Sequence, residues 1–161
     1  MKTIVKTVLH LQITAMFLTA ALAGPGAEKA VPFKGTLQQV ESHVVQFPVV
    51  AAEAIASGNA THLGRYTMAS EFEVNLLTFT GSGFADFIAA NGDSLFTEVT
   101  GQASPTDNTD FLIIVETYTV TGGTGRFAGA TGSFTVKRLL DTVTKVSVGS
   151  FDGTIMFAKA K

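Results

Sequence analysis

Apolar side chains recur at every second position through most of the chain beyond residue 32, and this two-residue period constrains the fold more than any other feature. In the segment 63–76, Tyr66, Met68 and Phe72 share one parity, and the residues between them are mostly polar. Such alternation is typical of a β-strand with one buried face. Glycine, proline, asparagine and aspartate separate the alternating segments at the spacing of hairpins. The pattern therefore predicts an all-β protein.

Eight segments fit this pattern, namely residues 33–40, 49–57, 63–76, 77–90, 94–101, 111–120, 133–140 and 146–157. Residues 51–56 would also suit a short helix, but Pro48 and the run Ser57-Gly58-Asn59 limit its length, so a strand is preferred. Eight antiparallel strands in sequential hairpins leave no free edge when they close on themselves. We therefore predict an eight-stranded antiparallel up-and-down β-barrel. A sandwich is the alternative, and the length of the predicted strands favours the barrel.

The N-terminal segment has the pattern of a secretory signal peptide. Two lysines precede an apolar run over residues 11–22, and Ala21-Leu22-Ala23 offers a small residue on each side of the expected cleavage position. The apolar run is too short to span a bilayer, so no stable membrane span is expected in the mature form. We predict a signal peptide over residues 1–23, a flexible N-terminus over 24–31, and a single barrel domain over 32–161. The mature protein is then secreted, either extracellular or periplasmic.

Composition removes several classes of function. The chain has no cysteine, which excludes disulfides, thiolate metal sites and a cysteine nucleophile. It has 11 basic and 13 acidic residues and no basic cluster, so no nucleic-acid partner is expected. The histidines lack the spacing of a metal site, and no metal is predicted. The segment Gly123-x-Gly125-x-x-Ala128 loosely fits a dinucleotide fingerprint, but a β pattern follows it instead of a helix, so no cofactor is predicted.

Five glycines occur between two strand patterns in the run Gly122-Gly123-Thr124-Gly125-Arg126-Phe127-Ala128-Gly129-Ala130-Thr131-Gly132. Glycine enters positive-φ conformations at little cost, so this run predicts a tight reversal, with Phe127 closing one end of the barrel. The run resembles the strand-turn-strand signature of the allene oxide cyclase and dirigent barrel superfamily. Residues 60–67 and 89–93 resemble segments of small secreted bacterial members of unassigned function.

The resemblance covers about residues 32–158 and implies the same barrel. For activity, it implies stereochemical guidance or cyclisation of apolar, reactive intermediates inside the lumen. No segment matches the catalytic positions of the plant enzymes one for one, so no catalytic residue is carried over.

The candidate catalytic residues come from strand parity instead. Glu116 and Tyr118 share a parity on residues 111–120, the most apolar segment of the mature chain. If this parity faces the lumen, burial would raise the pKa of the carboxyl group and prepare it for proton transfer. The alternative is that the opposite parity faces inward and Glu116 is solvated. Tyr66 is the third candidate, with core packing as its alternative role. The predicted ligand-binding residues are Met68, Phe72, Ile114 and Arg138.

These residues predict a small barrel that binds an apolar molecule in its lumen without turnover. The first alternative is a cofactor-free cyclase or isomerase that acts on an apolar polyene or polyketide-like substrate, with Glu116 and Tyr118 or Tyr66 handling protons. The second alternative is a structural barrel with no ligand that forms a homo-oligomer, because residues 111–120 are apolar on both parities. A lumen volume of a few hundred Å³ would favour the first two over the third.

Overall fold

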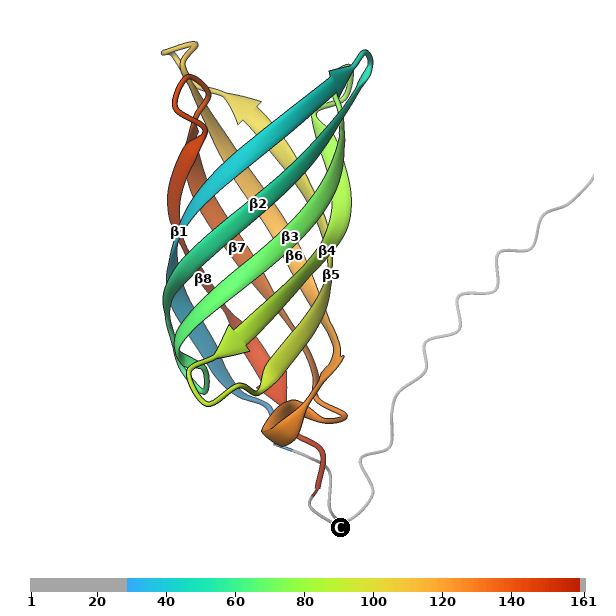
Figure 1. Ribbon diagram of the computed structural model, residues 1–161, viewed down its shortest axis with the longest axis vertical. Coiled ribbons are helices and arrows are strands. Elements are labelled where there is room, and N and C mark those ends of the chain that lie inside the picture. The colour runs from blue at the N-terminus through green and yellow to red at the C-terminus, as the bar shows by residue number, and fades with distance from the viewer. Residues whose placement is uncertain (1–28, 160–161) are drawn as a thin grey trace, which may run out of the picture.

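Strand follows strand around a closed barrel in sequence order (Figure 1). The computed structural model describes residues 29–159. The strands are β1 (Val31–Gln46), β2 (Val49–Ala60), β3 (Gly64–Asn75), β4 (Thr80–Ala89), β5 (Ser94–Pro105), β6 (Phe111–Gly123), β7 (Thr131–Asp141) and β8 (Val146–Met156). A single 3₁₀ turn, η1 (Gly125–Phe127), lies between β6 and β7. The predicted signal peptide, residues 1–23, lies outside the described residues.

Closure decides between the two predicted all-β architectures. Every neighbouring pair is antiparallel, and β8 pairs with β1 from Val31 opposite Ile155 to Val40 opposite Val146. No strand in the described part of the chain therefore has a free edge, which is how a barrel avoids edge-to-edge aggregation. The predicted up-and-down barrel is confirmed. The segment that would also have suited a helix belongs to β2.

Aromatic side chains fill the lower half of the lumen, next to the end where both termini of the described chain lie (Figure 1). The rings of Phe33 and Phe134 lie 4.9 Å apart in an edge-to-face arrangement, and Phe134 and Phe151 lie 5.0 Å apart. Phe87 contacts this group from β4. Ring pairs at these separations stabilise beyond the apolar area that they bury. This half of the barrel is therefore a solid core.

The glycine-rich run closes the lower end. Phe127, in η1, is fully buried and packs against Phe157, as its predicted role at the barrel end requires. Asp93, in the β4–β5 turn, accepts a hydrogen bond from the Arg126 backbone N–H at 3.2 Å. A side chain at Gly125 would meet this carboxylate, because a Cβ there would lie 1.8 Å from Asp93 Oδ1. The turn chemistry of two hairpins thus holds the aromatic plug in place.

On four adjacent strands, β6, β7, β8 and β1, the usual distribution of polar and apolar side chains is partly reversed in the upper half of the barrel. Polar or charged side chains point inward there beside the apolar Ile114 and Leu140, namely Glu116, Arg138, Ser147, Gln39 and Glu41. The outward neighbours are exposed and apolar, namely Val115, Leu139, Val148 and Val40. The same four strands therefore present a polar cluster to the lumen and an apolar surface to the outside.

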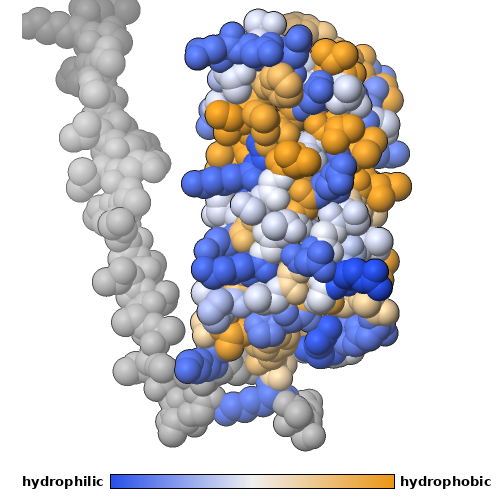
Figure 2. Space-filling model, turned by 90° about the vertical axis from the view of Figure 1, so that its left-hand side faces the viewer, coloured by the Kyte–Doolittle hydropathy of each residue, from blue (hydrophilic) through white to orange (hydrophobic). Residues whose placement is uncertain are grey.

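We call the exposed residues Val40, Ile55, Ile113, Val115, Leu139 and Val148 the outer apolar band. Strand register makes them neighbours, because Ile113 lies opposite Leu139, Leu139 opposite Val148, and Val40 opposite Ile55. Figure 2 shows apolar side chains gathered in the upper half of the face where β7, β8 and β1 lie. Exposed patches of this kind mark interaction surfaces in soluble proteins.

Candidate ligand-binding site

A cavity of about 290 Å³ occupies the upper half of the lumen, above the aromatic core. Most of its wall is apolar and includes Val50 and Ala52 on β2, Phe72 on β3, Val99 on β5, Ile114 on β6 and Leu140 on β7. Phe79 and Lys145, from the β3–β4 and β7–β8 turns, also line it, so the cavity reaches the end of the barrel opposite the termini. An apolar cavity with a few convergent polar groups is the usual form of a small-molecule site.

Two carboxylates and one guanidinium form the polar part of this wall. Arg138 donates to Glu116 through two parallel bonds, from Nε to Oε2 at 3.0 Å and from Nη2 to Oε1 at 2.8 Å. Its Nη1 donates to Glu41 Oε1 and, at 3.1 Å, to Ser147 Oγ. The three charged side chains are only 5–6% exposed. Bidentate pairing of this kind is the geometry in which arginine binds a carboxylate most strongly.

Glu41 is surrounded by hydrogen-bond donors from its own strand. Gln39 Nε2 donates to Glu41 Oε1 at 2.8 Å, and His43 Nε2 lies 2.8 Å from Glu41 Oε2. Burial by itself raises the pKa of the Glu41 carboxyl, but the charge of Arg138 and the hydrogen bonds from His43, Gln39 and Arg138 together lower that pKa below its ordinary value. Glu41 is therefore ionised at neutral pH.

Arg138 is held in its charged form by its partners. Burial lowers the pKa of the guanidinium, and the hydrogen bonds and charge of Glu116, followed by the charge of Glu41, more than compensate and raise it. A carboxylate that accepts two guanidinium N–H bonds is a weak proton acceptor, since protonation would break the pairing. The arrangement is thus better suited to holding a polar group of a ligand than to removing a proton from it.

Two buried polar atoms next to this cluster have no hydrogen-bond partner among residues 29–159. They are Gln39 Oε1, on β1, and Ser70 Oγ, on β3 directly across β2 from Glu41. Leaving a buried polar atom without a partner costs about 1–3 kcal/mol. The polar groups in the middle of the lumen are therefore not fully satisfied by one another.

Comparisons with known proteins agree with the architecture. No family model and no curated protein matches the chain. Among solved structures, the pterocarpan synthase dirigent protein GePTS1 matches with a TM-score of 0.58, over 83% of this chain and 88% of that chain, at 14% sequence identity. The chain folds as a dirigent-type barrel. The resemblance carried by the glycine-rich run is thus confirmed for the fold, and at this identity the likeness extends to the fold alone.

The dirigent-type barrel brings four of the predicted residues to the cavity wall. Glu116 and Arg138 form the charged pair, and Phe72 and Ile114 contribute apolar surface. Of the two orientations left open for Glu116, the structure has the inward one. Met68 is buried in the core and does not line the cavity.

The two tyrosines that were candidate catalytic residues lie below the cavity, in the aromatic core. Tyr118 stacks on Phe134 with ring centres 5.0 Å apart, and burial followed by the charge of Glu116 raises the pKa of its phenol. Tyr66 donates a hydrogen bond from its hydroxyl to the Thr36 carbonyl at 2.9 Å, and burial raises its pKa as well. Both phenols are neutral at physiological pH, and neither lines the cavity.

Four residues of the polar cluster were not found from the sequence: Gln39, Glu41, His43 and Ser147. The first predicted strand ended at residue 40, whereas β1 continues to Gln46. The signal was present, because Leu37, Gln39, Glu41 and His43 continue one parity. It was missed because the apolar residues of this segment, Val40 and Val44, point outward.

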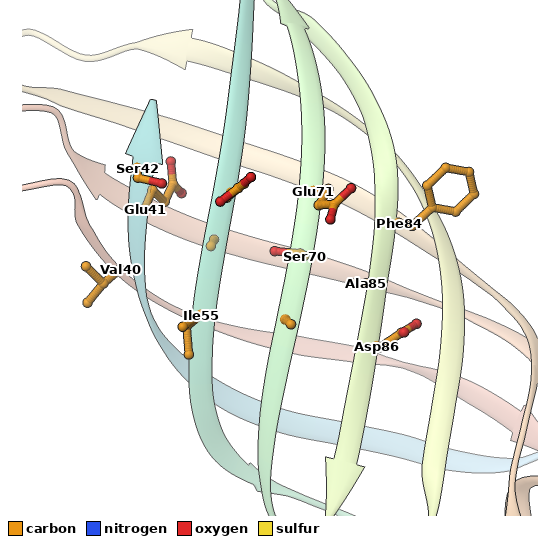
Figure 3. Close-up of a pocket in the computed structure, with 12 residues that line it drawn as sticks. Val40, Glu41, Ser42, Ile55, Ser70, Glu71, Phe84, Ala85 and Asp86 are labelled. Atoms are coloured by element: carbon orange, nitrogen blue, oxygen red, sulfur yellow. The ribbon is translucent and has the colours of Figure 1, made fainter. Parts of the chain in front are cut away.

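A second hollow, of about 580 Å³, lies on the outer surface of β1–β4 (Figure 3). Val40 and Ile55 border it on one side, and Phe84 and Asp86 on the other. Glu53 on β2 and Glu71 on β3 also line it, lie opposite each other in the strand register and are exposed to solvent. It is a shallow groove between exposed side chains, so the enclosed lumen is the better candidate site.

No group of histidine, aspartate and glutamate side chains in residues 29–159 could hold a metal ion. No helix in this part of the chain is long and apolar enough to cross a membrane.

Proposed function

We propose that this protein binds a small apolar molecule in the upper lumen of its barrel and releases it unchanged. The observation that supports this most directly is the cavity of about 290 Å³, whose wall is mostly apolar and includes the buried cluster of Glu41, Glu116 and Arg138. The apolar wall would supply affinity by removing the ligand from water, and the polar cluster would orient one end of it. The likeness to a dirigent protein is compatible with such a role.

Binding without turnover is preferred to the cyclase or isomerase alternative because of how the candidate groups are held. Both oxygens of Glu116 accept a hydrogen bond from Arg138, so a proton transfer to Glu116 would have to disrupt this bidentate pairing. Tyr66 is hydrogen-bonded to a backbone carbonyl outside the cavity. The enzyme reading would need these groups to be rearranged when a substrate binds.

We also propose that the protein acts outside the cytoplasm, as a secreted extracellular or periplasmic protein. The support for this is the leader pattern of residues 1–23, together with a barrel that contains no cysteine and needs no reducing environment.

A binding experiment with a lumen-filling variant tests the proposed function. Ala52 lines the cavity, whereas Ala51, its neighbour on β2, points to solvent. We expect Ala52→Phe to weaken the binding of phenylbutanol, measured by isothermal titration calorimetry, by roughly tenfold or more, because the new ring occupies the lumen. Ala51→Phe is the matched control and should leave the affinity unchanged.

Thermal unfolding shows whether Ala52→Phe still folds, and Val50→Phe, nearer the cavity mouth, fills the same space if it does not. Equal affinity in the lumen-filled variant and the control, or no binding of phenylbutanol to the unmodified protein, would rule out the lumen as the site.

A second candidate role is self-association through the outer apolar band. The observation that favours it is the row of exposed aliphatic residues on β6, β7 and β8, where Ile113, Leu139 and Val148 lie opposite one another. Burial of such a row against a second copy of the chain would remove it from water. Size-exclusion chromatography with light scattering tests this role, and a protein that stays monomeric at high concentration does not have it.

A further inference from the structure

The charges of the polar cluster in the cavity wall do not balance. Glu41 and Glu116 are two carboxylates, and Arg138 is the one guanidinium that they share. Tyr118, two residues from Glu116 on β6, adds no charge, because burial raises the pKa of its phenol. The buried cluster therefore carries one negative charge more than its positive charge compensates. In a site with little water, such an excess attracts a cation more strongly than it would at the surface.

Two other titratable side chains among residues 29–159 line the cavity. His43 contacts Glu41 through Nε2, and its protonated form would supply the missing positive charge. Lys145 lies at the mouth, and its charge acts on Asp141 at the end of β7. The cluster therefore has two sources of a balancing cation, which are a proton on His43 and a charged group of a ligand.

The hydrogen bonds of the cluster favour a ligand group that donates over a ligand group that accepts. Four donor contacts of Arg138 are directed at Glu116, Glu41 and Ser147. Each Glu116 oxygen accepts one bond from Arg138 and has a second lone pair available. An incoming ammonium would find free acceptors here, whereas an incoming carboxylate would meet two carboxylates of like charge.

We propose that the lumen selects an apolar amine, whose ammonium group contacts the carboxylates of Glu41 and Glu116 while its hydrocarbon part fills the apolar cavity. This inference rests on the proposed binding function and specifies the chemical class of its ligand.

Three probes with one hydrocarbon skeleton separate the charge preference from lumen binding itself. Phenylbutylamine, phenylbutanol and phenylbutyrate are titrated into the full mature protein at about pH 8, where histidine is neutral. We expect the amine to bind roughly tenfold or more tightly than the alcohol, and the carboxylate more weakly than either. If the alcohol binds as tightly as the amine, the amine proposal is overturned and the proposed function stands. If no probe binds, the proposed function fails.

A charge-neutralising variant locates the preference. Glu116→Gln removes the excess negative charge, and the ratio of amine to alcohol affinity should fall to within about threefold. Glu98→Gln, at an exposed position on β5, is the matched control and should keep the original ratio. A ratio that is unchanged in a folded Glu116→Gln protein contradicts the proposal.

The comparison of the three probes uses the unmodified protein, so it tests the amine proposal even if Glu116→Gln does not fold.

Discussion

Arg138 is the residue on which two buried carboxylates depend. Both of its neighbouring strands supply a partner, with Glu116 on β6 opposite Val136 and Ser147 on β8 opposite Leu140, while Glu41 reaches it from β1. Burying a charge costs several kcal/mol unless a partner compensates it, so removing the shared partner is far more damaging than replacing the whole cluster by apolar residues.

Replacing Arg138 by methionine should therefore destabilise the protein by about 3–5 kcal/mol at neutral pH. The loss should shrink in acid, because protonation removes the charge from the two stranded carboxylates. In the unmodified protein, acid has the opposite effect and lowers the free energy of unfolding. The pKa of Glu41 is lowered, so its stabilising effect is present above the ordinary carboxyl pKa and is lost as the pH falls through the lowered value. Urea denaturation at about pH 7 and about pH 4 measures both trends.

Arg126→Met is the matched control for this experiment. Arg126 makes an ion pair with Asp93 at 3.6 Å, and its side chain is 45% exposed. Pairs of this kind contribute at most about 1 kcal/mol. A loss at Arg138 that is no larger than the loss at Arg126, or that is the same at both pH values, would mean that the buried cluster is not held by charge.

Single residues were predictable from the sequence only where their strand was read correctly. Glu116 and Arg138 were found because they follow the alternation of β6 and β7. Glu41 and His43 were missed because they lie beyond residue 40, where the predicted strand ended. A rule that places apolar residues inside would also turn Val40 and Val44 towards the lumen, whereas both point outward. The reversal becomes visible only when β1 is placed beside β8, and no local pattern records that pairing.

At the scale of elements, β7 and β8 approach each other so closely that one glycine is required by both space and conformation. Gly132 has a φ of +141°, and a Cβ there would lie 2.3 Å from the Thr154 carbonyl oxygen. Gly122, at the bulge where β6 pairs with β5, has nearly the same φ, +144°, but a Cβ there would meet nothing within 4 Å. A comparison of the two positions therefore distinguishes the cost of the unfavourable φ, which both share, from the cost of steric contact, which only Gly132 has.

Gly132→Ala should therefore destabilise the barrel more than Gly122→Ala. Both substitutions cost about 1–3 kcal/mol for the unfavourable φ, and Gly132→Ala adds the displacement of the Thr154 carbonyl. Thermal unfolding of the two variants gives the comparison. Equal shifts in melting temperature would show that β8 yields easily at this point and that close approach is not what the glycine provides.

The eight strands themselves were predictable, because each alternates over most of its length and is bounded by turn residues. Their ends were less so. The connection between the predicted strands 94–101 and 111–120 is shorter than their bounds imply, since β5 continues to Pro105 and pairs there with Leu112. Hydrogen bonding to a neighbouring strand extends an element beyond the point where its own sequence stops favouring it.

At the scale of the whole molecule, the barrel is built from two halves with different tasks. The lower half is closed by Phe127 and filled by aromatic rings, which supply the burial that a domain without disulfides requires. The upper half holds a buried charged cluster in a mostly apolar lumen and carries exposed apolar residues on its outer face. The glycine-rich run, which carried the family resemblance, belongs to the lower half. For this reason the sequence predicted the fold more fully than the site.

The outer apolar band leads to a prediction about assembly. If the band is an interface between copies of the chain, lysine at Ile113 and Leu139 should shift the protein towards monomer, because two charges would be buried against apolar surface. Ile88→Lys is the matched control, since Ile88, on β4, has the same 47% exposure as Ile113 but lies away from the band. Light scattering over a range of concentrations measures the mass of each variant. A mass that drops equally in the control, or that does not drop in Ile113→Lys/Leu139→Lys, would place any oligomer interface elsewhere on the barrel.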